Sequence, residues 1–164
     1  ARATGLPLIV DGDTGYGGLL NVHHTVKGYE AAGVTAIQLE DQEFPKKCGH
    51  TPGKRVIAAA DMAEKIRVAV DARESRDFVV LARTDARQME GMDGVLRRLE
   101  AYANAGADVL LSNHTAFDGS KTKLPAMATR RPGEPHPYVI GAPGVARYVT
   151  VAEECALAGR ARLP

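Results

Sequence analysis

Short apolar runs alternate with longer amphipathic segments along the first two-thirds of this 164-residue chain. Apolar runs of this length predict buried strands, which we expect at 8–10, 36–39, 78–82 and 108–111. The segments between them have helical spacing, which predicts helices over 21–32, 57–72 and 95–105. Repeated strand–helix–strand units imply right-handed crossovers and one parallel sheet.

Polar residues follow every predicted strand: Asp11 and Asp13, Glu40 and Asp41, Arg83 and Asp85, Asn113 and His114. A doubly wound sheet and a (β/α) barrel both build their sites at this carboxyl edge. A site shared by several strand ends favours the barrel. We therefore predict an α/β fold, a partial (β/α)8 TIM-type barrel of about four parallel strands with helices, over residues 1–112.

The alternation ends near residue 112. The stretch 113–138 is polar and contains several glycines and prolines, and it is long for a connection inside one compact domain. A short strand at 138–140 and a helix over 145–158 are expected after it. We predict that 113–164 forms an irregular C-terminal segment with a terminal helix, and we consider an origin outside the barrel fold for it.

Composition narrows the functional classes. A formal charge of +1 gives no electrostatic reason to expect nucleic acid or an anionic membrane surface as partner. No apolar stretch approaches the roughly 20 residues that span a bilayer, and no signal-peptide pattern is present. The two cysteines do not form a disulfide framework, which favours a cytoplasmic protein with free thiols, Cys155 being buried in its helix. The first residue is Ala1 and not Met, so we expect upstream sequence.

Two carboxylates, Asp11 and Asp13, alternate at the end of the first predicted strand, and glycines follow them. Together with Glu40 at the next strand end they offer the oxygen ligands that Mg²⁺ prefers. The alternative is structural: Asp11 ends the strand and Asp13 caps the following helix. The pair alone does not decide between these interpretations, but Glu40 favours the metal site.

The segment Lys46-Lys47-Cys48-Gly49-His50 places a thiol among cationic neighbours. Such neighbours favour the thiolate form, so Cys48 can act as a thiolate or as an exchangeable acid. The glycine allows a turn that brings the thiol and the imidazole into one site. The alternative is an exposed basic loop with an incidental cysteine.

Arg83 ends an apolar strand, where a charge is costly unless it has a partner. Its guanidinium suits bidentate recognition of a carboxylate. Asp85 is close enough in sequence to pair with it, so a structural ion pair at the barrel rim is equally consistent. Tyr16, in the acidic loop, either lines the pocket or packs against the turn.

These motifs, in this order, resemble the isocitrate lyase/phosphoenolpyruvate mutase superfamily over residues 6–110. The similarity lies in VDGDTGYGG (10–18), YEAAGV (29–34), QLEDQ (38–42), KKCGH (46–50), KIRVAVDAR (65–73) and LARTDAR (81–87). The cysteine loop resembles that of the 2-methylisocitrate lyase-like branch, which includes dimethylmalate-lyase-like proteins. The resemblance therefore implies a carbon–carbon lyase.

The resemblance also implies roles for individual residues. Asp11, Asp13 and Glu40 would hold Mg²⁺, with Mn²⁺ as a substitute. Cys48 would handle the proton at the carbon released, with Lys46, His50 and Arg83 as further catalytic residues. The expected substrate is a small hydroxylated di- or tricarboxylate, contacted by Tyr16, Gly49, Arg83 and Asn113. Half a barrel has open sheet edges, so we also expect a homo-oligomer.

A second, weaker resemblance links 108–160 to the C-terminal part of metallo-β-lactamase-fold hydrolases, in which His114 would correspond to a zinc ligand. One histidine cannot form a zinc site, so a zinc hydrolase is disfavoured. Two further hypotheses stay open: an oxaloacetate decarboxylase or hydrolase of the same superfamily, and an inactive truncated fragment.

Overall fold

The computed structural model describes residues 6–48, 51–107 and 119–160. Three strands form one sheet in the order β1-β2-β3, with both pairs parallel. These strands are β1 (Ile9–Asp11), β2 (Ala36–Glu40) and β3 (Val79–Arg83). The helices among the described residues are α1 (Leu19–Ala31), α2 (Ala59–Ala72), α3 (Arg87–Asn104), α5 (Ser120–Thr129) and α6 (Gly141–Arg160).

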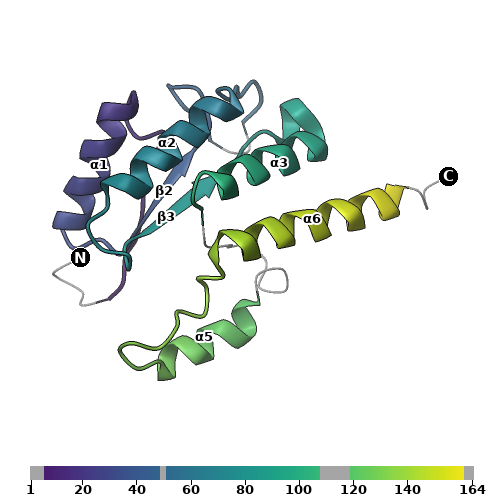
Figure 1. Cartoon of the computed structure of the whole chain (residues 1–164). Coiled ribbons are helices and arrows are strands. Elements are labelled where there is room, and N and C mark those ends of the chain that lie inside the picture. The colour runs from purple at the N-terminus through teal and green to yellow at the C-terminus, as the bar shows by residue number, and fades with distance from the viewer. Residues whose placement is uncertain (1–5, 49–50, 108–118, 161–164) are drawn as a thin grey trace.

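The sheet is covered by helices on one face (Figure 1). Ile37 and Leu39 of β2 are fully buried on that face, and they pack in one apolar cluster with Val22 of α1 and with Met62 and Ile66 of α2. Because successive residues of a strand point to opposite faces, Gln38 and Glu40 point to the other face. The helices therefore bury one face, and the other face is left to carry polar side chains at its carboxyl edge.

The strand register brings the predicted polar strand ends together. Asp11 of β1 pairs with Gln38 of β2, and Glu40 of β2 pairs with Arg83 of β3. In-register neighbours in a parallel sheet share a face, so all four side chains lie on the face opposite the core helices.

The structure confirms the three strands and the three connecting helices of the prediction within a few residues, except at the start of α3. That helix begins at Arg87, before the predicted 95, and it is kinked at Gly91, whose φ is 67°. The fourth predicted strand, 108–111, lies outside the described residues. The coarser fold prediction, an α/β unit with parallel strands, is confirmed.

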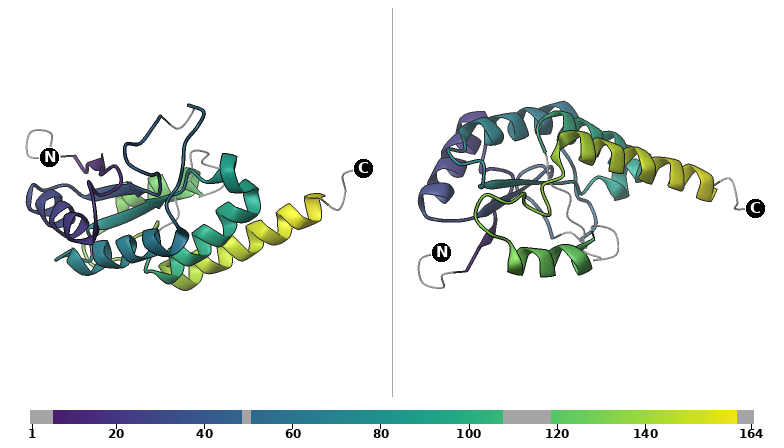
Figure 2. Two further views of the ribbon diagram at one scale, coloured as in Figure 1. Left: turned by 90° about the horizontal axis from the view of Figure 1, so that it is seen from above. Right: turned by 60° about the horizontal axis from the view of Figure 1, so that its bottom comes forward.

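The C-terminal segment contains more helix than we predicted. α5 lies within the stretch 113–138 that was expected to be irregular, and it includes Pro125. Residues 138–140 form a turn and a single bridge residue, so the short strand predicted there is wrong. α5 lies on the opposite side of the sheet from α2 (Figure 2).

α6 packs against α3, and its Val145 and Val149 are buried. The remainder of this helix is more open, and Cys155 is exposed, so the prediction that Cys155 is buried is wrong. No helix in the described part of the chain is long and apolar enough to cross a membrane. The division into parts at residue 112 stays a prediction.

Candidate active site

The turn after β1 places two carboxylates beside the end of β2. Gly12 allows close contact, because a Cβ at this position would lie 2.6 Å from Ile37 Cδ1. Its amide donates to the carbonyl of Gln38 at 2.8 Å. Asp13 follows with a φ of 55°, a left-handed conformation that aspartate tolerates better than most residues. The amide of Asp13 donates to Asp11 Oδ1 at 2.8 Å, which orients the first carboxylate.

Lys46 brings the three predicted metal ligands together. Its Nζ donates to Asp11 Oδ2 at 3.0 Å and lies 3.6 Å from Glu40 Oε1 and 3.9 Å from Asp13 Oδ2. The loop after β2 carries this lysine back over the sheet edge. Asp11, Asp13 and Glu40 therefore lie around one ammonium group, and their role as metal ligands stays a prediction.

Glu40 is the buried member of this cluster. Its side chain is 2% exposed, and Oε1 has no hydrogen-bond partner among the described residues. Burial raises the pKa of this carboxyl above its usual value, and the nearby charges of Lys46 and Arg83 offset only part of the effect. A buried carboxylate oxygen without a donor is costly, and it is typical of a position that a cation completes.

The contact between Asp11 and Lys46 lowers the pKa of the carboxyl group and raises the pKa of the ammonium group. Burial alone would raise the pKa of Asp11, but the amide of Asp13 and the ammonium of Lys46 outweigh it and lower that pKa. Burial alone would lower the pKa of Lys46, but the hydrogen bond to Asp11 and the charge of Glu40 outweigh it and raise that pKa. Both groups are thus held in their charged forms.

Arg83 extends the cluster along the edge to β3. Its Nη1 lies 3.5 Å from Glu40 Oε2, and its Nη2 donates to Asp85 Oδ1 at 3.1 Å. Gln42 Nε2 donates to Asp85 Oδ2 at 3.0 Å, and Lys54 Nζ lies 3.8 Å from Asp85 Oδ1. The Arg83–Asp85 ion pair that the sequence left open is present, and Arg83 also faces the carboxylate cluster.

A buried hydrogen-bond network around Asp41 holds the carboxyl ends of β2 and β3 together. The sequence did not predict this network. Asp41 is fully buried, and its Oδ1 accepts the backbone amide of Asp85 at 2.9 Å. Its Oδ2 accepts hydrogen bonds from Thr84 Oγ1 at 2.7 Å, Tyr102 OH at 2.7 Å and Arg98 Nη1 at 3.3 Å. The sequence shows only that Asp41 is an acidic residue next to Glu40, and nothing in it indicates that Arg98 and Tyr102 of α3 are the partners of Asp41.

Tyr16 lies in the turn after β1, half exposed, and its hydroxyl is 3.1 Å from that of Tyr29. That hydrogen bond, with burial, raises the pKa of Tyr16 to about 12. The same hydroxyl lies 3.5 Å from the backbone carbonyl of Asp11. Both contacts agree with the interpretation in which Tyr16 packs against the turn, and its role in binding substrate stays a prediction.

The cysteine loop is described only in part. Cys48 is exposed, and its carbonyl accepts the amide of Thr51 at 2.8 Å. Gly49, His50, Asn113 and His114 lie outside the described residues, so their predicted roles stay predictions.

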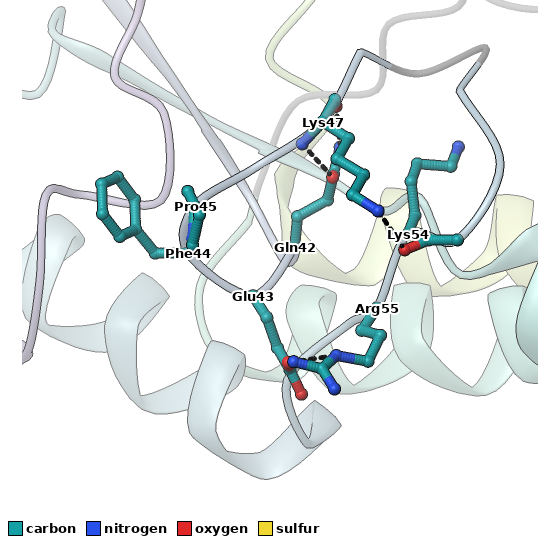
Figure 3. A pocket seen from close by; sticks show the side chains of 8 residues that line it. Gln42, Glu43, Phe44, Pro45, Lys47, Lys54 and Arg55 are labelled. Carbon is teal, nitrogen blue, oxygen red and sulfur yellow. Dashed lines mark hydrogen bonds and ion pairs between the residues drawn. The ribbon is translucent and has the colours of Figure 1, made fainter.

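The same loop lines an open hollow of about 340 Å³ with residues 42–45, 47 and 53–55 (Figure 3). Its cations are already engaged: Lys47 Nζ donates to the carbonyl of Gly53 at 3.0 Å, and Arg55 pairs with Glu43 at 2.7 Å. Lys47 therefore points away from the carboxylates that Lys46 contacts. The two neighbouring lysines have different surroundings.

The charge balance of the edge favours a bound cation. Four carboxylates, those of Asp11, Asp13, Glu40 and Asp85, share three cationic groups, those of Lys46, Lys54 and Arg83. The donor set and the unpartnered Glu40 oxygen suit a hard divalent ion. In the described part of the chain, however, no three His, Cys, Asp or Glu side chains stand in an arrangement ready to hold a metal. The chemistry fits, and Lys46 occupies the centre.

Comparison with known proteins places this geometry in a family. The phosphoenolpyruvate phosphomutase profile matches residues 1–153. The chain belongs to the phosphoenolpyruvate phosphomutase family. Since the match continues through most of the C-terminal segment, the expected resemblance of that segment to metallo-β-lactamase-fold hydrolases has no support.

Relatives of this family member include lyases. The chain is 52% identical over 109 residues to 2,3-dimethylmalate lyase of Eubacterium barkeri, a match that covers 66% of this chain and 38% of the relative. It is 47% identical over 110 residues to 2-methylisocitrate lyase of Shewanella oneidensis, a match that covers 67% and 38%. The chain thus spans little more than a third of the length of these relatives.

The fold similarity extends over nearly the whole chain. A solved structure of phosphonopyruvate hydrolase in complex with oxalate and Mg²⁺ matches 98% of this chain and 60% of its own, at 31% identity and a TM-score of 0.58. The described strands and helices therefore correspond to part of the barrel fold of this family.

Proposed function

We propose that this chain carries the cation and carboxylate site of a Mg²⁺-dependent carbon–carbon lyase. The substrate would be a small hydroxylated di- or tricarboxylate, such as a 2-methylisocitrate-like acid, and the product an α-keto acid. The observation that carries the proposal is the convergence of Asp11, Asp13 and Glu40 at one strand edge beside Lys46 and Arg83. The lyase relatives support the choice of reaction.

In this proposal the cationic residues neutralise negative charge and Cys48 transfers a proton. Cleavage of a bond next to a carboxylate leaves negative charge on an enolate, which fixed positive groups stabilise. Lys46, among the three carboxylates, and Arg83, beside Glu40, would neutralise the substrate carboxylates together with His50. Cys48, two positions after Lys46 on the same loop, would deliver a proton to the carbon released.

The residues that would hold Mg²⁺, with Mn²⁺ as a substitute, are Asp11, Asp13 and Glu40. When bound, such an ion supplies electrostatic stabilisation of developing oxyanion charge. The solved complex of phosphonopyruvate hydrolase contains Mg²⁺ and oxalate, a small dicarboxylate. That complex supports both the metal and the ligand class.

A second candidate is hydrolysis or decarboxylation of an oxaloacetate-like acid. It is favoured by the structural match to oxaloacetate acetylhydrolase, which covers 93% of this chain, a larger share than the 70% that the structure of 2,3-dimethylmalate lyase covers. The two reactions differ in their need for the thiol. Only the lyase assigns a proton transfer to Cys48.

The test is turnover of 2-methylisocitrate and 2,3-dimethylmalate in the presence of Mg²⁺, with α-keto acid formation as the readout. The Cys48→Ser variant should lose roughly 10²–10⁴-fold in rate, the usual contribution of a positioned acid. It should keep the rise in melting temperature that Mg²⁺ causes, because the thiol is not a proposed ligand. Cys155→Ser, which removes the other exposed thiol, is the matched control and should retain full rate.

Unchanged turnover in Cys48→Ser would remove the assigned role of Cys48 and favour the second candidate. A wild-type chain without product from any of these acids would overturn the proposed activity for this chain.

A further inference from the structure

Lys46 occupies the position that the proposed function assigns to a divalent ion. Its ammonium lies within 4 Å of all three carboxylates, at 3.0 Å from Asp11, 3.6 Å from Glu40 and 3.9 Å from Asp13. Only the first of these contacts is a hydrogen bond. A single positive charge therefore faces three carboxylates, and it makes a hydrogen bond only with that of Asp11.

The incomplete partner is the buried one. Glu40 Oε1 has no hydrogen bond among the described residues, although its side chain is 2% exposed and lies next to Lys46. Because the ammonium of Lys46 donates to exposed Asp11, it stays 3.6 Å from Glu40 Oε1 and makes an ion pair but no hydrogen bond with that oxygen. An ion that accepts several oxygen ligands at short range would satisfy Glu40 better than Lys46 does.

Two cations cannot share these oxygens without cost. Like charges that lie within about 4 Å of each other repel at the effective dielectric typical of a protein surface, and a divalent ion doubles the charge on one side. Lys46 is also free to leave, because it sits on a loop and its side chain is 28% exposed. Occupation by metal therefore requires that Lys46 withdraw from Asp11.

We infer that Lys46 and a divalent cation are alternative occupants of the Asp11–Asp13–Glu40 cluster. In the metal-free chain the ammonium holds the carboxylates together; when the ion binds, Lys46 is displaced. The inference rests on the metal part of the proposed function and adds a competition to it. The same displacement leaves Lys46 unpaired at the site edge, where it is available to a substrate carboxylate.

Lys47 provides a matched comparison. It adjoins Lys46 on the same loop and carries the same charge, but its Nζ donates to the carbonyl of Gly53 and contacts none of the three carboxylates. Removing its charge changes the net charge of the chain by the same amount. Only a local competition distinguishes the two lysines.

The experiment is calorimetric titration of MgCl₂ into the 164-residue chain and its Lys46→Gln and Lys47→Gln variants. Competition predicts that Lys46→Gln binds Mg²⁺ at least about tenfold more tightly than wild type, whereas Lys47→Gln changes the affinity less than about threefold. Lys46→Arg keeps the charge at the cluster and should not gain affinity. Equal or weaker binding by Lys46→Gln, or an equal gain by Lys47→Gln, would overturn the inference.

Stability gives a second readout. Without metal, Lys46→Gln removes the cation that Asp11, Asp13 and Glu40 share, so the variant should melt below wild type. Saturating Mg²⁺ should raise the melting temperature of the variant more than that of wild type. A larger rise in wild type contradicts the competition. Tighter Mg²⁺ binding by Lys46→Gln, together with no turnover by wild type, would uphold the competition and overturn the lyase. Turnover by wild type, together with unchanged or weaker Mg²⁺ binding by Lys46→Gln, would uphold the lyase and overturn the competition.

Discussion

Glu40 is the residue of the carboxylate cluster whose surroundings cost the folded chain most. A glutamate with a raised pKa, an unpartnered oxygen and 2% exposure destabilises the folded state relative to a hydrogen-bonded one. Asp11, at the same edge, is exposed and fully paired. Buried groups with a perturbed pKa and a charged neighbour occur often at functional sites. The burial of Glu40 is therefore the residue-level reason to look for a bound cation here.

His136 allows a prediction about pH that is independent of the site. Burial lowers its pKa from the ordinary value of 6.5, as does the charge of Arg130, while Asp77 opposes them. Its Nδ1 accepts the amide of Tyr138 at 3.3 Å, which requires the neutral ring. The stabilisation is therefore fully present above pH 6.5 and is lost as pH falls through the lowered pKa, because the unfolded chain binds the proton first.

The His136→Asn variant keeps an acceptor for the Tyr138 amide but does not titrate. We expect wild type to lose more unfolding free energy than this variant between about pH 7.5 and about pH 5. Urea denaturation at the two pH values measures the difference. Identical losses would show that His136 is not the titrating group.

At the scale of elements, α3 holds the carboxylate edge through side chains rather than through the sheet. Tyr102 and Arg98 of α3 reach Asp41, which in turn fixes the amide of Asp85 after β3. Arg98 also donates to the carbonyl of Ile57, just before α2, at 2.9 Å. The buried carboxylate thus connects the ends of β2 and β3 with α3, and Arg98 extends the connection to the residues ahead of α2.

Tyr102→Phe should lower the free energy of unfolding by roughly 1.5–3 kcal/mol, the usual value for a hydrogen bond to a charged group. The ring stays in place, and the substitution removes the donor to buried Asp41 together with an acceptor that lies 3.4 Å from Arg98 Nη1. Tyr29→Phe is the control, since its hydroxyl bonds to Tyr16 at the surface and its loss should cost less than about 0.5 kcal/mol. Chemical denaturation of both variants decides; comparable losses would contradict a special role for the network.

At the scale of the whole molecule, the sequence predicted which residues meet but not how they pair. Parallel strands end at one edge, so Asp11, Glu40 and Arg83 could be placed together from periodicity alone. The contact of Lys46 with Asp11 spans 35 positions and depends on a loop path that no pattern encodes.

Helices that contain breaking residues were the other limit of the prediction. Pro125 argued against α5, yet the helix forms with the proline in its second turn. α3 was predicted too short because Gly91, in the left-handed region, interrupts its first part. Local propensity therefore located the core helices well, including α1 with its internal Gly28, and failed at Pro125 of α5 and at the left-handed Gly91 of α3.

The edge strand β1 leads to a prediction about self-association of the chain. β1 pairs only with β2 among the described residues, and Ile9 in it is 63% exposed. A strand edge with an exposed apolar side chain invites pairing with another chain. We expect the 164-residue chain to self-associate through this edge, which agrees with the homo-oligomer expected from the sequence.

Ile9→Lys should shift the chain toward monomer, because a charge on the edge strand opposes pairing. Sedimentation velocity over a range of concentrations measures the shift, and circular dichroism checks that the fold is kept. Leu157→Lys, which places the same charge at an exposed apolar position of α6, is the control and should leave association unchanged. If the α6 variant dissociates the assembly and Ile9→Lys does not, the contact lies on the helix face and the β1 edge is not the interface.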